Sequence, residues 1–308
     1  MSKALNQDKF VSIIIPTYNH AKYLSKAINS VLAQSYLNWE MIIVDNYSTD
    51  NTENIVKKIF DRRITYIKVN NNGVIALSRN AGIQIAKGEW IAFLDSDDWW
   101  TPDKLKVCMN LASESVGIIY HTMKIERKQA SFFIRNSLNS WQLKKPVIND
   151  LLIRGNPIAN SSVIIRSDLI KTIGKIDENV EMIAAEDFNT WLRVAEITDQ
   201  FLYIPKKLGY YLLHNENTSQ KNTLKMTRSA CAQFLCKLNK QEIFIYESYL
   251  SLEEAKFLIN SKKYWPAIKK MKFSFIYGSS SIKIKSIIIF ILIIKKFIFN
   301  GLIKNDNR

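Results

Sequence analysis

Short apolar runs alternate with longer amphipathic segments over the first third of the chain. The runs are rich in Ile and Val, as in strands that are buried on both faces of a sheet. They occupy Val11–Pro16, Trp39–Val44, Arg63–Val69 and Ile91–Leu94. Between them, apolar residues recur at helical spacing around residues 23–32, 55–60 and 75–86. This alternation predicts βαβ units, and therefore an α/β fold with a mostly parallel sheet flanked by helices.

Polar residues follow three of the predicted strands, at the point where each strand ends. Thr17 follows the first strand, Asp45 the second, and Asp95–Asp98 the fourth. Ligands of parallel sheets bind beyond the carboxyl ends of the strands. We therefore expect a binding site here, although ordinary solvated turns would also be polar.

The acids at the end of the fourth strand have two possible explanations. Three carboxylates within four residues, Asp95, Asp97 and Asp98, are costly beside a buried strand unless a cation lies among them. No Cys or His is nearby in the sequence, and hard oxygen ligands suit Mg²⁺ or Mn²⁺ shared with a substrate phosphate. Alternatively, Thr101 caps the next helix, Pro102 begins it, and the acids are solvated.

Composition and short motifs exclude several classes of protein. With 47% hydrophobic and 23% charged residues, the 308-residue chain is globular. It contains neither GxGxxG after the first strand nor GxxxxGK[ST], which argues against dinucleotide oxidoreductases and P-loop enzymes. The three cysteines form no CxxC pair, and Met1–Phe10 lacks the apolar core of a secretory signal. We therefore expect a cytoplasmic protein.

Positive charge is concentrated near the C-terminus. Lys256–Arg308 holds twelve Lys and Arg against one acid, a net +11 of the chain's +15. Its longest apolar run, Ile287–Ile294, spans about 12 Å as a helix, short of the roughly 30 Å bilayer core. Lysines bracket this run, which favours peripheral contact with the anionic inner face of the cell membrane. An ordinary packed helix with outward-pointing lysines is the alternative. No nucleic-acid-binding motif accompanies the charge, so we predict no nucleic-acid partner.

Four segments together resemble a known enzyme family. Val11–Asn19, Val44–Thr52, Ser78–Gly82 and Ala86–Asp98 resemble, in order and spacing, motifs of the inverting family-2 glycosyltransferases of the GT-A fold. The resemblance covers Phe10–Ser219. It implies a GT-A domain over residues 1–220, with a donor half at 10–123 and an acceptor half at 124–220. A helical, basic region at 221–308 would follow.

The resemblance implies a nucleotide-sugar donor and assigns residues to it. Pro16, Thr17 and Tyr18 would line the nucleoside pocket, Asp45 and Asn46 would meet the base and ribose, Arg79 would lie near the base or diphosphate, Asp95 would approach the ribose, Ser96 would also belong to the donor site, and Asp97 would ligate the metal. Many members carry a second acid where this chain has Asn46. Uridine is therefore the first expectation for the base, and deoxythymidine the second.

Two further motifs fall in the second half of the chain. Glu186 and Asp187 open a predicted helix, where acids are also expected from the helix dipole. The resemblance implies that Asp187 is the general base. His214 lies in a segment, Tyr210–His214, that resembles the family's Tyr-Arg-x-His, with Leu212 in place of the usual Arg. His214 would complete the metal or diphosphate site, although a solitary His is often structural.

These inferences predict a metal-dependent, inverting hexosyltransferase of polysaccharide biosynthesis. It would use Mg²⁺ or Mn²⁺ to move a sugar from a UDP-sugar to a lipid-linked or cell-surface glycan. One rival is a nucleotidyltransferase, which also holds Mg²⁺ on paired aspartates. Another is a basic nucleic-acid-binding protein, which would bind DNA or RNA with steep salt dependence.

Overall fold

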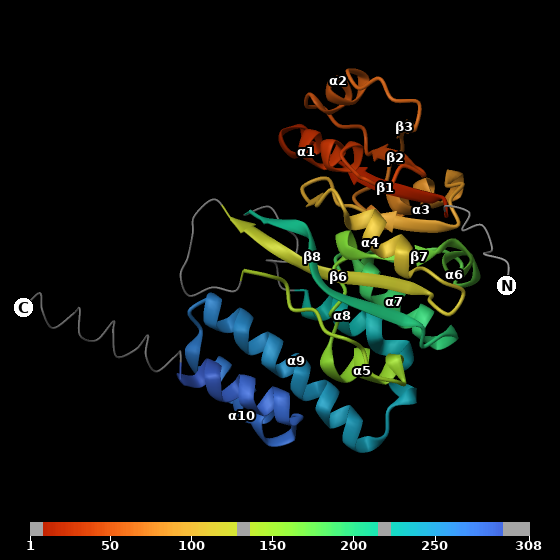
Figure 1. The fold of residues 1–308 in the computed structure, drawn as a ribbon. Coiled ribbons are helices and arrows are strands. Elements are labelled where there is room, and N and C mark those ends of the chain that lie inside the picture. The colour runs from red at the N-terminus through yellow and green to blue at the C-terminus, as the bar shows by residue number, and fades with distance from the viewer. Residues whose placement is uncertain (1–8, 128–135, 215–222, 292–308) are drawn as a thin grey trace, which may run out of the picture. The chain divides into compact units, whose positions relative to one another are not determined.

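A computed structural model describes residues 9–127, 136–214 and 223–291 (Figure 1). The chain divides into two compact units. One comprises Met1–Ile148 and Asn156–Lys221, and the other comprises Asn149–Gly155 and Asn222–Arg308. The predicted apolar run Ile287–Ile294 is described as far as residue 291, and the rest of the tail lies outside the described residues.

A mixed eight-stranded sheet forms the centre of the first unit. Its strand order is β3-β2-β1-β4-β7-β6-β8-β5. The first four strands in this order are parallel to one another, as are β6 and β8, whereas β7 and β5 are antiparallel to their neighbours. The strands are β1 Val11–Thr17, β2 Trp39–Asp45, β3 Ile64–Lys68, β4 Trp90–Phe93, β5 Trp99–Trp100, β6 Ile118–Arg127, β7 Ile164–Arg166 and β8 Phe201–Leu213.

Helices cover both faces of this sheet. They are α1 Ala21–Leu32, α2 Thr52–Lys57, α3 Ile75–Ile85, α4 Lys104–Leu111, α6 Ser167–Thr172 and α7 Glu186–Ile197, with short 3₁₀ turns η1 Asn160–Ser162 and η2 Val180–Met182. A further helix, α5 Val147–Arg154, begins in the first unit and continues into the second.

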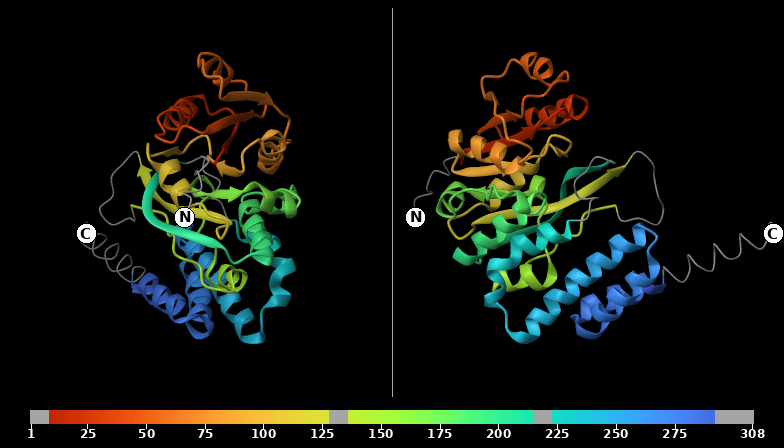
Figure 2. Two further views of the ribbon diagram at one scale, coloured as in Figure 1. Left: turned by 45° about the vertical axis from the view of Figure 1, so that its right-hand side comes forward. Right: turned by 180° about the vertical axis from the view of Figure 1, so that it is seen from behind.

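Alternation along β1 explains the layers, because successive side chains of a strand point to opposite faces. Val11, Ile13 and Ile15 are fully buried in one cluster with the apolar faces of α1, α2 and α4. Ile14 points to the other face, where α3 approaches so closely that a Cβ on Gly82 would lie 2.6 Å from Ile14 Cγ2. Figure 2 shows α1 and α3 on opposite sides of β1.

The second unit is helical. It contains α8 Leu224–Cys231, η4 Ala232–Lys237, α9 Lys240–Asn260, α10 Tyr264–Tyr277 and a further helix over residues 280–291. Asn239 and Glu242 form a capping box that begins α9. The Ser274 hydroxyl of α10 donates to the Ser248 carbonyl of α9 at 2.9 Å. Within the described residues, no helix combines the length and apolar character needed to cross a bilayer.

The predicted α/β class, the first four strands and the helical C-terminal region are confirmed. The helix-cap interpretation of Thr101 and Pro102 is wrong, because α4 begins only at Lys104. The Thr101 amide donates instead to the Leu208 carbonyl at 3.0 Å. This bond continues the antiparallel pairing of β5 with β8, which keeps Trp99 and Trp100 extended.

Candidate active site

A cavity of about 620 Å³ lies beyond the carboxyl ends of β1 and β4 in the first unit. Ligands of parallel sheets bind at this position. Seven of the predicted site residues line it: Pro16, Arg79, Asp95, Ser96, Asp97, Asp187 and His214. The other four predicted residues, Thr17, Tyr18, Asp45 and Asn46, are not part of its wall.

The loop of three aspartates is anchored at both ends. The Asp95 amide donates to Ser161 Oγ at 3.0 Å, which attaches the start of the loop to η1. Asp98 Oδ1 accepts from the Leu212 amide of β8 at 3.1 Å. Asp98 is buried, and this burial together with Asp97 raises its pKa well above 3.8. Asp98 therefore helps to fix the loop in which Asp97 lies.

Asp97 meets His214 across the end of β8. Asp97 Oδ2 lies 2.8 Å from His214 Nε2, although the two residues are 117 positions apart. Burial, and then the nearby Asp95 carboxylate, raises the pKa of Asp97. The His214 ring stacks on Tyr23 with 5.0 Å between centroids. The structure thus brings the two predicted metal ligands together.

This pair fits a divalent metal as a partial coordination site. Carboxylate oxygen and imidazole nitrogen are suitable donors for Mn²⁺, and oxygen is suitable for Mg²⁺. Among the described residues, no group of three or more His, Cys, Asp or Glu side chains could hold a metal without further ligands. A metal on Asp97 and His214 would therefore take its remaining ligands from a substrate and from water.

Arg79 links the aspartate loop to α7. Its guanidinium is buried, with Nη2 2.9 Å from Asp95 Oδ1 and Nη1 2.5 Å from Glu186 Oε1. Asn160 also donates to Asp95 Oδ1, at 3.1 Å. These contacts neutralise two acids and hold them in fixed positions. The sequence resemblance predicted a donor-site role for Arg79, but its bridge to Glu186 had no sequence signal.

Asp187 lies next to this bridge in the first turn of α7. Its pKa is raised to about 7, first by burial and then by Glu186, with Arg79 acting in the opposite direction. Its Oδ1 accepts from the Phe188 amide at 2.6 Å. The neighbouring Glu186 Oε2 is buried without a hydrogen-bond partner among the described residues. Two neighbouring residues of the cavity wall therefore differ: Asp187 has a pKa near neutral pH, and Glu186 has a buried oxygen without a hydrogen bond.

The ends of β1 and β2 form a second polar region. Asp45 is fully buried, with Oδ1 accepting from Ser48 Oγ at 2.5 Å and Oδ2 from the Tyr66 hydroxyl at 2.6 Å. Asn46 Oδ1 accepts from the Asn71 amide at 2.9 Å. Tyr18 is 53% exposed. In this conformation, Asp45 and Asn46 organise their own loops, and the Tyr18 ring is open to a ligand.

His20 is a site residue that sequence analysis missed. It lies in the turn before α1, lines the cavity, and places Nδ1 2.8 Å from Ser96 Oγ. A single His in a polar turn gives no sequence signal. The contact depends on two segments that are 76 positions apart.

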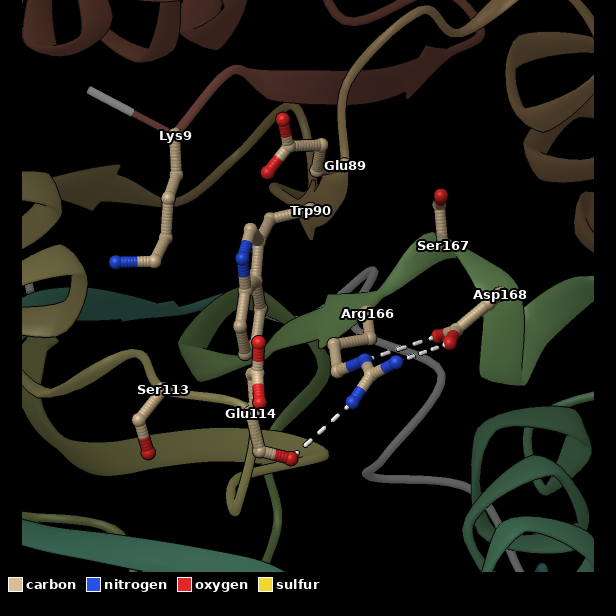
Figure 3. A pocket seen from close by; sticks show the side chains of 8 residues that line it. All are labelled: Lys9, Glu89, Trp90, Ser113, Glu114, Arg166, Ser167 and Asp168. Atoms are coloured by element: carbon tan, nitrogen blue, oxygen red, sulfur yellow. Dashed lines mark hydrogen bonds and ion pairs between the residues drawn. The ribbon is translucent and has the colours of Figure 1, made fainter. Parts of the chain in front are cut away.

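A smaller hollow of about 330 Å³ lies at the opposite end of β4, where Trp90 begins the strand (Figure 3). Arg166 in its wall is paired with Asp168, and its Nη1 donates to the Glu114 carbonyl at 3.2 Å. The guanidinium is therefore already engaged. The larger cavity, which collects the predicted site residues, is the better candidate for chemistry.

Several known proteins resemble this chain in sequence or fold. The model of glycosyl transferase family 2 matches residues 12–170. An Escherichia coli protein, UDP-Glc:alpha-D-GlcNAc-diphosphoundecaprenol beta-1,3-glucosyltransferase WfaP, is 37% identical over 60% of this chain and 70% of its own length.

Two solved structures share the fold. S. aureus TarS 1-349, solved in complex with UDP-GlcNAc, superposes with a TM-score of 0.64 and 19% identity, covering 89% of this chain and 82% of that one. The mannosyltransferase PcManGT from Pyrobaculum calidifontis, solved with GDP-Man and Mn²⁺, gives a TM-score of 0.59 and 18% identity, covering 89% of this chain and 77% of that one. Together with the matched family model, these likenesses show that the chain belongs to glycosyl transferase family 2 and is a glycosyltransferase with the GT-A fold.

Proposed function

We propose that this enzyme transfers a sugar from a UDP-sugar to a glycan hydroxyl, with inversion at the anomeric carbon. The observation that carries the proposal is one cavity lined by both the Asp95–Asp98 loop and Asp187. Arg79 contacts Asp95 on one side and Glu186 on the other. Donor and acceptor groups could therefore meet within this cavity.

Uridine is the proposed base of the donor. The *E. coli* relative is named for UDP-Glc, and TarS was solved with UDP-GlcNAc. In this chain, Thr17 Oγ1 is buried without a hydrogen-bond partner among the described residues, and the Tyr18 ring is exposed nearby in sequence. The exposed Tyr18 ring offers a face on which the base of a nucleoside can stack.

Asp97 and His214 are the proposed ligands of Mn²⁺ or Mg²⁺. When bound, the metal supplies a Lewis acid for the negative charge that develops on the leaving diphosphate. Asp98 and Arg79 keep the loop in place through the Leu212 amide and Asp95. The imidazole nitrogen favours Mn²⁺ over Mg²⁺ as the better partner.

Asp187 is the proposed general base. As a carboxylate it takes the proton of the acceptor hydroxyl while the hydroxyl oxygen forms the new bond to the anomeric carbon. The electron pair of the breaking C–O bond leaves with the nucleoside diphosphate. A pKa of about 7 suits a base that works near neutral pH. Glu186, whose Oε2 has no hydrogen-bond partner among the described residues, is the proposed partner of a second hydroxyl of the sugar acceptor.

The acceptor is proposed to be a lipid-linked or cell-surface glycan reached from the cytoplasmic face of the membrane. In the second unit, large apolar side chains are exposed on α10 and on residues 280–291: Trp265, Phe275, Ile276, Tyr277, Ile284, Ile287, Ile288, Phe290 and Ile291. An apolar groove of about 350 Å³ lies between these two helices, with Lys272 at its wall. Apolar exposure combined with basic charge supports contact with an anionic membrane surface.

Vesicle sedimentation tests the membrane contact. Replacing Lys283 and Lys285 by Gln should reduce binding to anionic phosphatidylglycerol vesicles, and phosphatidylcholine vesicles should bind little in either case. Lys106 and Lys171, exposed on the first unit, provide a matched double Gln control that should bind normally. Equal loss of vesicle binding in both double variants would contradict a membrane-binding surface located on the second unit.

The transfer reaction is tested with a panel of nucleotide sugars and nucleoside triphosphates. We expect release of UDP from a UDP-sugar that depends on Mn²⁺ or Mg²⁺ and on an acceptor. Pyrophosphate release from a triphosphate would instead support the nucleotidyltransferase alternative. Asp187→Ala should abolish transfer but leave UDP binding nearly unchanged, and loss of both together would count against its role as base.

A further inference from the structure

The cavity is strongly acidic, and this is difficult to reconcile with an anionic ligand. Five carboxylates line it: Asp95, Asp97, Asp98, Glu186 and Asp187. A nucleoside diphosphate brings further negative charge, and like charges at close range repel in a low-dielectric site. Its binding therefore requires positive charge or N–H donors that the carboxylates have not already engaged.

Three side chains in the described wall carry basic nitrogen: Arg79, His214 and His20. The Arg79 guanidinium is divided between two carboxylates. The His214 imidazole contacts Asp97. His20 forms its side-chain hydrogen bond with a neutral group, the Ser96 hydroxyl. Among these three, His20 is the one whose nitrogen is not paired with a carboxylate in the described structure.

Two sets of contacts fix the orientation of His20. Nδ1 is held 2.8 Å from Ser96 Oγ, and Ser96 itself is 4% exposed. The imidazole packs edge-on against Tyr23, at 5.6 Å between centroids, and against His214, at 6.3 Å. Edge-to-face packing of this kind favours one ring orientation. His20 is thus positioned beside the middle residue of the Asp-Ser-Asp sequence.

We propose that His20 is a diphosphate-binding residue of the donor site, an inference that rests on the proposed function. Ser96 donates its hydroxyl hydrogen to Nδ1, so the neutral imidazole carries its own hydrogen on Nε2. Nε2–H then donates to a non-bridging oxygen of the donor diphosphate. Ser96 acts as a positioning residue, because its hydroxyl selects this tautomer.

Two substitutions at His20 test the two imidazole nitrogens independently. The amide of His20→Asn lies near the place of Nδ1, so it keeps a partner for Ser96 but does not reach the position of Nε2. The longer side chain of His20→Gln brings its amide near the position of Nε2. Ser96→Ala removes the positioning hydroxyl and leaves the imidazole in place. Thermal denaturation of each variant checks that the fold is intact.

Calorimetric binding of UDP and of uridine, with Mn²⁺ present, is the test. We expect His20→Asn to raise the dissociation constant of UDP about tenfold, the usual effect of one hydrogen bond to a charged group. His20→Gln should stay within about threefold of the wild type. Ser96→Ala should weaken UDP binding less than His20→Asn does. Uridine, which has no phosphate, should bind equally to all four proteins.

Two results would overturn the proposal. One is UDP binding by His20→Asn that equals the wild type. The other is equal weakening of UDP and uridine, which would show that His20 only supports the loop. If wild-type protein binds neither UDP nor dTDP, the proposed donor class itself is wrong, and this result is distinct from a failure of the His20 variants alone.

Discussion

Replacing Asp187 by Asn should stabilise the protein while it abolishes transfer. Burial and the adjacent Glu186 raise the pKa of Asp187 from 3.8 to about 7. The folded protein therefore binds this proton more tightly than the unfolded chain does. The stabilisation from the proton is complete below about pH 4 and is lost as the pH rises through about 7. The Asn side chain does not ionise, so the stability of Asp187→Asn relative to the wild type increases as the pH rises from about 4 through about 7.

The size of the effect follows from the shift and from the exposure of the group. About three pKa units correspond to about 4 kcal/mol at 1.36 kcal/mol per unit. Asp187 is half-buried and faces a cavity, so water screens part of this energy. We expect the free energy of unfolding of Asp187→Asn to exceed that of the wild type by about 1–2 kcal/mol at pH 8, and by less at pH 5.

Urea denaturation at pH 5 and pH 8, followed by tryptophan fluorescence, measures this difference. Glu181→Gln is a suitable control, because Glu181 is an exposed carboxylate in the 3₁₀ turn shortly before α7. It should change stability by less than about 0.5 kcal/mol at either pH. A variant at position 187 that is less stable at pH 8, or whose gain is the same at both pH values, would refute the reasoning. Wild-type transfer activity in that variant would refute the assignment of the base.

Three other substitutions test the candidate site and the packing of the sheet. Arg79→Met leaves two carboxylates without their counter-ion and should cost about 3–5 kcal/mol in urea denaturation, whereas a loss below 1 kcal/mol would show that the bridge is unimportant. Gly88→Ala places a Cβ 2.5 Å from the Ser12 backbone nitrogen and should cost about 1–3 kcal/mol, and a neutral effect would contradict that close packing. Asp97→Asn should weaken Mn²⁺-dependent UDP binding about tenfold or more in calorimetry while uridine binding is unchanged, and unaltered UDP affinity would remove Asp97 from the metal site.

The local pattern of the sequence was sufficient for the parallel half of the fold. Strands buried on both faces have continuous apolar runs, and Val11–Thr17 is buried at every position. Pairing between distant segments was not predictable in the same way. The interpretation of Thr101 as a helix cap was wrong because the pairing of Trp99–Trp100 with β8 competes with the local capping tendency.

The same distinction applies to the candidate site. Acids at strand ends gave a local signal, and the family resemblance brought in Asp187 and His214. The contact from Arg79 to Glu186 spans 107 positions, and the contact from His20 to Ser96 spans 76. Such contacts depend on how the sheet folds each loop towards the cavity, and neither residue pair has a spacing that reveals it.

The central claim is direct transfer in one cavity, with Asp187 as base and a nucleoside diphosphate as leaving group. The anomeric configuration of the product tests it most directly, because attack opposite the leaving group must invert the donor carbon. A UDP-α-sugar should give a β-glycoside, as measured from the anomeric proton coupling in the NMR spectrum of the purified product. An α-glycoside from the same donor would contradict the account.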